Sequence, residues 1–376
     1  TPLYSSAASD VYKRQAGELT ATAPAATKNP SGDNRMNPFP RLIPRCLAAA
    51  VLAVATLAGA APASAAAYPE RPINLVVPMP PGGGTDVVSR LLAERLGVAT
   101  GWSLVVQNKP GATGNIGMDY VARAQPDGYT VGMGQAANLA INPALYPKMP
   151  FDPKKDFTLV GLIAAQPVVL VVRADSPYKT LADLVDDAKK KPASSLRLAS
   201  AGNGTIGHMS GVMLARRAGI EFLHVPYKGA GPAVTDLVGG QTDLYFITPQ
   251  TAFPLLAANK LRALAVTSNT RLAALPDVPT VAESGYPGFE ASAWTGLVGP
   301  AHMPPDMVTQ LNARIQTVLK EPDLIKRLEA EGSQPLGGTP ADFEAYMKSE
   351  TTKWADVVKA ANIKICLLYT SDAADE

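Results

Sequence analysis

Three glycine-rich segments are the parts of this sequence whose residue types and spacing point to chemistry. They are residues 78–86 (PMPPGGGTD), 108–117 (NKPGATGNIG) and 200–208 (SAGNGTIGH), each between an apolar run and a helical pattern. Glycine has no Cβ, so several backbone N–H groups can approach one ligand. A helix N-terminus adds free donors and a partial positive charge. Together the segments predict a site for an anion such as a carboxylate; for any single segment, a tight turn without a ligand is the alternative.

Side chains that would support catalysis or metal binding are sparse. The phosphate-loop pattern G-x-x-x-x-G-K-[ST] is absent, and residues 207–211 (GHMSG) lack the spacing of G-x-S-x-G. The histidines His208, His224 and His302 are far apart and have no metal-ligand spacing. We therefore predict that the protein is not an enzyme and has no catalytic residue, metal or cofactor. His208 either contacts the ligand or braces the third segment, and Asp86 has a structural use as an acid in the first turn of a helix.

The elements that must position these segments alternate between short apolar runs and helical patterns. Such runs are typical of strands buried on both faces of a largely parallel sheet. Helical patterns follow Thr85, follow Thr180 as an N-cap, and cover residues 340–361. This alternation predicts an α/β architecture. The predicted strands are residues 73–77, 104–106, 130–133, 168–172, 196–199, 222–225, 243–247, 261–267 and 294–298.

Both ends of the chain are expected to lie outside the folded protein. Residues 1–15 and 366–376 resemble translated sequencing adapters, and residues 1–35 are interpreted as foreign to the native protein, which would begin at Met36. Residues 36–65 have the basic start, apolar run and small-x-small site of a secretory signal peptide, with cleavage expected after Ala65. The apolar run, 47–61, is shorter than the about 20 residues of a membrane span. We therefore predict export.

Composition narrows the class further. The chain has 34 basic and 32 acidic residues, a net charge of +2, which argues against a nucleic-acid partner. Both cysteines fall outside residues 66–365, so we expect no disulfide and no cysteine metal site in the mature chain. The expected mature chain, residues 66–365, has about 300 residues. At about this length a single hydrophobic core tends to be replaced by two domains.

The glycine-rich segments carry a resemblance to a known family. Pro78, Pro81, Gly82, Gly83 and Asp86 match the pattern P-x-x-P-G-G-x-x-D of the Bug-type solute receptors of tripartite tricarboxylate transporters. The resemblance extends from about residue 68 to 365. The motifs that follow in the same order are residues 108–111 with 114–117, 126–129, 141–143, 203–205 with His208, 226–229, 264–267 and 276–280.

The resemblance implies a type II periplasmic-binding-protein fold, with two α/β lobes, a ligand cleft and two crossovers. We expect lobe 1 at residues 68–167 plus 276–365 and lobe 2 at residues 168–275. The lobes would close around a small carboxylate, and the closed receptor, a monomer in the periplasm, would deliver it to a membrane permease. No chemistry would occur.

The resemblance also implies the ligand-binding residues. They are Met79, Gly83, Gly84, Thr85 and Asp86 in the first segment, Gly114 and Asn115 in the second, Asn203, Gly204, Thr205 and His208 in the third, and Ile247. Thr113 departs from the family by replacing a frequent glycine. Ile247 and Thr248 stand where many relatives carry an acid or amide, which favours an uncharged ligand body over the ammonium group of an amino acid.

Two alternatives remain open at this stage. One is a ligand sensor that reports to a signalling partner, which the residues do not distinguish from a transport receptor. The other is a periplasmic hydrolase with the glycine-rich loops as an oxyanion site, which lacks a convincing pair of nucleophile and base. Backbone recognition identifies a carboxylate head and leaves the rest of the ligand open.

Overall fold

The computed structural model describes residues 68–363. The predictions for the adapter-like ends, the signal peptide, its cleavage at Ala65 and both cysteines fall outside these residues. None of the helices between residues 68 and 363 is long and apolar enough to cross a bilayer.

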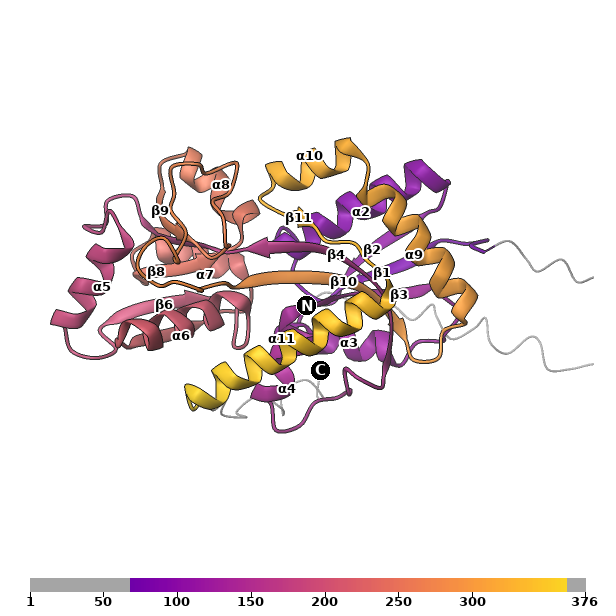
Figure 1. Ribbon diagram of the computed structural model, residues 1–376, viewed down its shortest axis with the longest axis horizontal. Coiled ribbons are helices and arrows are strands. Elements are labelled where there is room, and N and C mark those ends of the chain that lie inside the picture. Colours follow the sequence, from indigo (N-terminus) through magenta and orange to yellow (C-terminus); the bar gives the residue numbers. More distant parts are fainter. Residues whose placement is uncertain (1–67, 364–376) are drawn as a thin grey trace, which may run out of the picture. The chain divides into compact units, whose positions relative to one another are not determined.

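A six-stranded sheet, sheet A, forms the first lobe, with strand order β11-β4-β10-β3-β1-β2 (Figure 1). β1 pairs in parallel with β2 and β3, whereas β10 runs antiparallel to β3 and β4. The strands are β1 (Ile73–Val77), β2 (Leu104–Asn108), β3 (Thr130–Gln135), β4 (Phe157–Pro167), β10 (Ser292–Pro300) and β11 (Gln334–Pro335).

A five-stranded sheet, sheet B, forms the second lobe, with strand order β7-β6-β8-β5-β9. β6 is parallel to β7 and β8, whereas β5 is antiparallel to β8 and β9. The strands are β5 (Val169–Arg173), β6 (Leu196–Ser200), β7 (Phe222–Pro226), β8 (Leu244–Ile247) and β9 (Leu261–Val266).

Helices cover both faces of each sheet, as α/β layering requires. On sheet A, the apolar sides of α2, α9 and α10 bury one face, and those of α3 and α11 bury the other. On sheet B, α5 and α6 pack on one face and α7 and α8 on the other. The helices are α2 (Gly84–Thr100), α3 (Asn115–Ala122), α4 (Asn142–Leu145), α5 (Leu181–Lys190), α6 (Ile206–Ala218), α7 (Ala230–Val238), α8 (Pro249–Ala257), α9 (Pro305–Leu319), α10 (Pro322–Ala330) and α11 (Pro340–Ala360), with a 3-10 turn η1 (Ala112–Gly114) and a π-helix η2 (Ala136–Ile141).

The predicted fold class is confirmed, and the expectation of largely parallel sheets is wrong. Each predicted run falls on a strand, but β5 and β10 enter their sheets from the opposite lobe and therefore run against the strands beside them. The sequence pattern also missed β4, whose residues Gly161, Ala164 and Ala165 have weak strand propensity.

The chain crosses between the lobes twice, and Thr267 ties the two crossovers together. The first crossover joins β4 to β5 at Val168, and the second joins β9 to β10. Thr267 is fully buried, and its Oγ1 accepts a hydrogen bond from Val168 N (2.9 Å) and donates to Ala291 O (2.5 Å). These bonds give the lobes one shared hinge. The predicted lobe limits stay a prediction, although the division into two sheets agrees with them.

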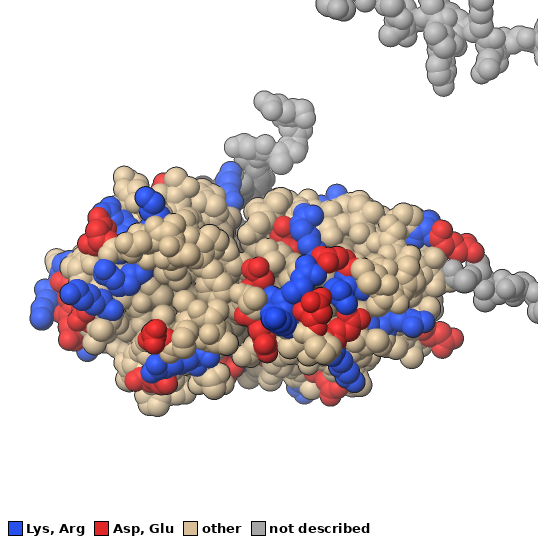
Figure 2. Space-filling model, turned by 90° about the horizontal axis from the view of Figure 1, so that it is seen from above, with Lys and Arg blue, Asp and Glu red and all other residues tan. Residues whose placement is uncertain are grey.

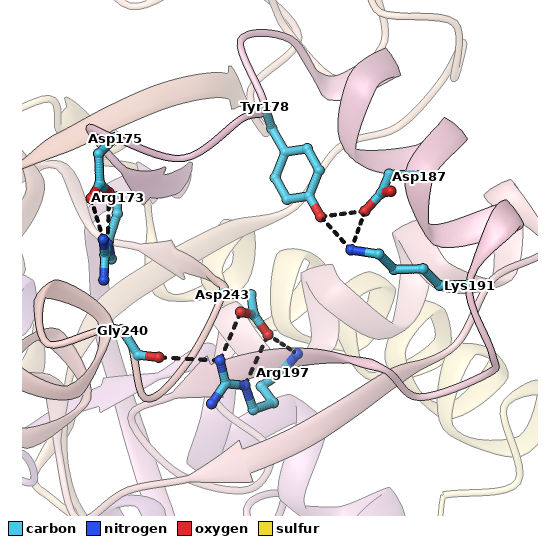
Figure 3. A network of polar contacts seen from close by, with 8 residues as sticks. All are labelled: Arg173, Asp175, Tyr178, Asp187, Lys191, Arg197, Gly240 and Asp243. Carbon is cyan, nitrogen blue, oxygen red and sulfur yellow. Dashed lines mark hydrogen bonds and ion pairs between the residues drawn. The ribbon is translucent and has the colours of Figure 1, made fainter.

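Polar contacts fix the outer part of lobe 2 (Figure 3). Arg197 on β6 forms an ion pair with Asp243, just before β8, with 2.9 Å between Nη2 and Oδ1. The same guanidinium donates to Gly240 O (3.1 Å), and so ties the turn before β8 to β6. Tyr178 donates to Asp187, which also pairs with Lys191 at 2.7 Å. The start of β8 is therefore held from outside while its other end reaches the cavity described below.

Charges of both signs are interspersed on the face drawn in Figure 2. Arg95 of α2 pairs with Glu321, and Arg327 of α10 pairs with Glu94 at 2.7 Å. Mixed charge of this kind is typical of a solvated surface. The face drawn in Figure 2 shows no basic stripe of the kind that binds nucleic acid.

Candidate functional site

A cavity of about 210 Å³ lies between the two sheets, at the edge where β1, β3, β6 and β8 end. Residues of both lobes form its wall. They are Met79, Pro80, Pro81, Gly82, Gly83, Gly84, Thr85, Gln135, Ala136, Ala137, Gln166, Val168, Ala201, Thr205, Ile206, Gly207, Ala230, Gly231, Tyr245, Phe246, Thr248, Thr251, Ala293 and Trp294. The volume is many times the about 10–15 Å³ that a cavity of this kind needs to hold one water molecule, so the cavity suits a small organic ligand.

Four helices begin at this cavity. The first residues of α2, α6 and α7 are part of its wall, and α8 reaches the wall through its N-cap Thr248 and through Thr251, although its first residue, Pro249, has no N–H. Their N-cap residues are Gly83, Thr205, Gly229 and Thr248, and none of these caps its helix with a side-chain hydrogen bond. Elsewhere, α5 and α11 are closed by capping boxes, for example the one that Thr180 forms with Asp183, whereas α3, α9 and α10 also lack a side-chain cap. The uncapped termini leave backbone N–H groups and the positive ends of four helix dipoles directed at the cavity.

The described wall contains no Asp, Glu, Lys, Arg or His side chain. Its polar side chains are neutral amides and hydroxyls. An anion in the cavity would therefore be held by backbone N–H groups and neutral donors, without a salt bridge. This arrangement resembles the anion sites that helix N-termini form.

The first predicted segment lies in the wall. Met79, Gly83, Gly84 and Thr85 all line the cavity. Asp86 does not, because its carboxylate is used inside the loop. It accepts hydrogen bonds from Gly82 N (3.0 Å) and Asn108 Nδ2 (2.9 Å), and it pairs with Arg90 at 2.9 Å. Burial alone would raise the pKa of Asp86, but the hydrogen bonds from Arg90, Gly82 and Asn108 lower it on balance. The structure thus gives Asp86 a loop-bracing role, and a direct ligand contact stays a prediction.

The second predicted segment lies behind the wall. Asn115 accepts a hydrogen bond from Asn142 Nδ2 (2.8 Å), and a Cβ on Gly114 would lie 2.8 Å from Asn138 Nδ2. Asn138 lies within η2 and Asn142 is its C-cap, so the second segment lies against η2, whose residues Ala136 and Ala137 do line the cavity. A π-helix is a rare element that is often found at functional sites.

Thr113, the residue that departs from the family pattern, joins the lobes. Its backbone is left-handed, with φ of 53°, a conformation that favours glycine. Its Oγ1 donates to Asn203 O across the cleft, at 2.7 Å. A glycine would adopt the backbone more easily and would lose this contact.

In the third predicted segment, Thr205 lines the cavity and His208 braces the loop. Gly204 N donates to Nδ1 of His208 (3.2 Å), and the His208 ring stacks on His224, with 3.8 Å between centroids. Burial, with a smaller contribution from His224, lowers the pKa of His208 to about 3, and burial lowers the pKa of His224 to about 4. Both rings are neutral at neutral pH, so Nδ1 of His208 remains an acceptor. Ligand contacts by Asn203, Gly204 and His208 stay predictions.

The structure brings together a serine and a histidine that no sequence motif pairs. Ser200 Oγ lies 2.7 Å from His224 Nε2, although the residues are 24 positions apart. Ser200 is fully buried and outside the cavity wall, and its Oγ also accepts from Gly202 N (3.2 Å). This pair therefore organises the third loop and does not present a nucleophile to the cavity.

At the end of β8, the wall is formed by the neighbours of Ile247. Tyr245, Phe246 and Thr248 line the cavity, whereas Ile247 is 1% exposed and packs in the core against α7 and α8. Sequence reasoning also missed Ala230 and Gly231. The signal was present, because residues 229–231 (GAG) are again glycine-rich and lie between a strand and a helix.

A buried polar cluster beside Gly84 joins the lobes at the other side of the cavity. Gln166 Nε2 donates to Gly84 O (3.1 Å) and to Ser333 Oγ (3.1 Å). Gln250 of α8 donates to the same Ser333 Oγ at 2.7 Å. Ser333 precedes β11 in lobe 1, so this cluster fastens the start of α8 to the opposite lobe. We call Gln166, Gln250 and Ser333 the interlobe latch.

Comparisons with known proteins show similarity to solute receptors. The profile of the tripartite tricarboxylate transporter family receptor matches residues 88–363. Protein BugT of Bordetella pertussis is 35% identical over 322 residues, which are 85% of this chain and 98% of BugT.

Two solved structures from Rhodopseudomonas palustris superpose on the chain. Rpa4515 with adipate has a TM-score of 0.76 and 37% identity, covering 79% of this chain and 99% of that one. MatC with bound malate has a TM-score of 0.72 and 34% identity, covering 77% of this chain and 100% of that one. These likenesses support the two-lobed receptor fold.

Proposed function

This chain belongs to the family of receptors of tripartite tricarboxylate transporters, and from that premise we propose that it is a periplasmic receptor for a small carboxylate. In this proposal the closed, loaded receptor delivers its ligand to the membrane permease subunits of such a transporter. The protein binds and releases its ligand unchanged.

One observation carries the carboxylate assignment: four uncapped helix N-termini meet at a cavity whose described wall is neutral. Each terminus is equivalent to about half a positive charge. An anion gains from all four, while a cation finds no acidic side chain in the described wall. The adipate and malate of the two solved relatives are carboxylates of suitable size.

The body of the ligand is proposed to be uncharged. An amino acid would place its ammonium group in a wall that offers no described carboxylate, and an unpaired buried charge is costly. This agrees with the expectation drawn from Ile247, although the support now comes from the wall as a whole.

Closure about the shared hinge would capture the ligand. The latch and the hydrogen bond from Thr113 to Asn203 are two separate contacts between the lobes. Both form only when the lobes are together. Opening must break them, so they favour the closed state that a permease would recognise.

Thermal unfolding with a panel of carboxylates tests the proposal. The panel contains adipate, malate and other small acids, each paired with its amide, together with amino acids. A ligand that binds only the folded state adds about 2.7 kcal/mol at one hundred times its Kd, so a clear rise in Tm is expected for at least one acid and none for its amide. Stabilisation by amides or amino acids alone would contradict the carboxylate assignment.

Delivery to a permease needs its own measurement. Ligand uptake by membrane vesicles that contain the transporter's membrane subunits should require the loaded receptor. If the receptor binds its acid and uptake does not depend on it, the transport role is wrong and a sensor role is favoured.

A further inference from the structure

Tyr245 is a buried polar residue of the cavity wall whose hydroxyl has no partner among the described residues. It is 3% exposed, and no described residue forms a hydrogen bond with its Oη. Tyr178, also buried in lobe 2, donates its hydroxyl to Asp187. Buried tyrosine hydroxyls usually find a partner, so the free hydroxyl of Tyr245 calls for one from outside the chain.

The other polar side chains of the wall already have partners within the protein. Gln135 donates to Thr85, Gln166 to Gly84 and Ser333, and Trp294 Nε1 to Glu350. Thr205 Oγ1 donates to Gly202 O (2.8 Å), and the hydroxyls of Thr248 and Thr251 lie 3.4 Å apart. Gln166 Oε1 also lacks a partner among the described residues, but it is an acceptor and would repel a carboxylate. Tyr245 is therefore a wall side chain with a donor and no partner among the described residues.

Packing fixes the position of the Tyr245 ring. The ring belongs to the core formed with Ala199 and Ala233. Its Cε2 lies 3.5 Å from where a Cβ on Gly207 would be, so its edge is beside the second residue of α6. Ala233 lies one turn into α7. The ring thus stands between the starts of α6 and α7, two of the four termini directed at the cavity.

The hydroxyl has access to the cavity. Buried side-chain atoms that lack a partner and are sealed from solvent include Asn138 Nδ2, Ser210 Oγ and Thr242 Oγ1; Tyr245 Oη is not among the sealed atoms of the described residues. Burial raises the pKa of Tyr245 well above its ordinary range, so the group is a neutral donor at neutral pH.

We propose that Tyr245 is a specificity-determining residue whose Oη–H donates a hydrogen bond to a carboxylate oxygen of the ligand, between the starts of α6 and α7. This inference rests on the proposed function and extends it to a particular side chain. The ring is held before the ligand arrives, so little rotamer freedom is lost on binding. In this proposal the site binds the carboxylate through a side-chain hydroxyl as well as through backbone N–H groups.

The test is Tyr245→Phe, which removes the hydroxyl and keeps the ring, with Tyr178→Phe as the matched control. Kd values for adipate and malate are measured by calorimetry in the full chain, together with the Tm of the ligand-free proteins. Hydrogen bonds to charged groups contribute about 1.5–3 kcal/mol. Y245F should therefore bind both acids about 10- to 100-fold more weakly, with no loss of ligand-free Tm. Y178F should show the reverse: a lower Tm and an unchanged Kd.

Two results for Y245F would overturn the inference. One is a Kd for both acids within twofold of the wild-type value, and the other is weaker binding accompanied by a lower ligand-free Tm, which would attribute the loss to the fold. A loss for malate alone would assign the hydroxyl to the malate 2-hydroxyl group instead of a carboxylate. If the wild-type protein binds neither these acids nor any other carboxylate of the panel, the proposed function itself fails, which is distinct from a binding wild type with an unaffected Y245F.

Discussion

At the scale of single residues, the stacked pair of His208 and His224 determines how the third loop is held. The loop depends on an unprotonated Nδ1 of His208, which accepts the Gly204 N–H. A proton on that nitrogen would remove the acceptor and place a charge in a buried site, where it is costly. The neutrality of this pair is therefore a condition for the shape of the loop.

The pair predicts a loss of stability in mild acid. The folded-state pKa values, about 3 and about 4, lie below the ordinary 6.5, so the unfolded chain binds protons first as the pH falls. The stabilisation is complete above pH 6.5 and is lost progressively as the pH falls toward these folded values. At about 1.36 kcal/mol per unit, one histidine contributes a loss of about 2 kcal/mol between pH 6.5 and 5.

Denaturant unfolding at pH 7 and pH 5 checks this expectation. The loss between the two pH values should be smaller in His208→Gln than in the wild type, because one of the two buried imidazoles is gone. His302 is exposed, so His302→Gln should lose as much as the wild type. If His208→Gln and His302→Gln lose the same free energy of unfolding between pH 7 and pH 5, the buried pair does not cause the loss of stability in acid.

At the scale of elements, the starts of α6 and α7 differ in how closely they approach their sheet. A Cβ on Gly207 would lie 2.3 Å from the backbone oxygen of Phe246, whereas a Cβ on Gly231 would meet nothing within 4 Å. Both glycines line the cavity. Glycine is thus needed at the first position to let α6 lie against β8, and at the second it leaves space in the cavity.

These two positions give a matched pair of substitutions. Gly207→Ala should lower the free energy of unfolding by about 1–3 kcal/mol, the usual cost of overpacking. Gly231→Ala should leave it unchanged or raise it by up to about 1 kcal/mol, because alanine favours the helix. Denaturant unfolding of both variants measures the difference; equal destabilisation would mean that α6 can move away from β8 without cost.

The elements also show where sequence reasoning succeeds and where it fails. Loops 78–86 and 200–208 were found because strand, glycines and helix are a local pattern. The same pattern at 108–117 does not reach the cavity, because β2 is an edge strand of sheet A. Strand order is set by tertiary packing, so the sequence could not place this loop relative to the cavity, and ligand contacts by Gly114 and Asn115 stay predictions. It also could not reveal that the π-helix after β3 would line the cavity instead.

At the scale of the whole molecule, the latch couples the lobes through one buried hydroxyl. Ser333 is fully buried and accepts hydrogen bonds from both Gln166 and Gln250. Without its oxygen, two buried amide donors lose an acceptor, and such a loss costs about 1–3 kcal/mol. Part of this cost arises only when the lobes are together, because Gln250 comes from the opposite lobe.

Ser333→Ala is therefore expected to weaken ligand binding about tenfold, mainly through faster dissociation. Surface plasmon resonance with the immobilised protein gives the association and dissociation rates separately. Ser349, whose hydroxyl bonds only within α11, supplies the control Ser349→Ala with unchanged rates. A slower association with an unchanged dissociation rate would contradict a role in holding the closed state.

The proposed binding of an anion by main-chain N–H groups has an evolutionary consequence. In that proposal the conformation of four helix starts would supply most of the attraction, and many side chains could maintain that conformation. Substitutions elsewhere in the wall can then change the space around the rest of the ligand, while the backbone N–H groups that would bind its carboxylate stay in place. A lineage built on this cavity could acquire new substrates by successive small replacements without passing through a form that binds nothing.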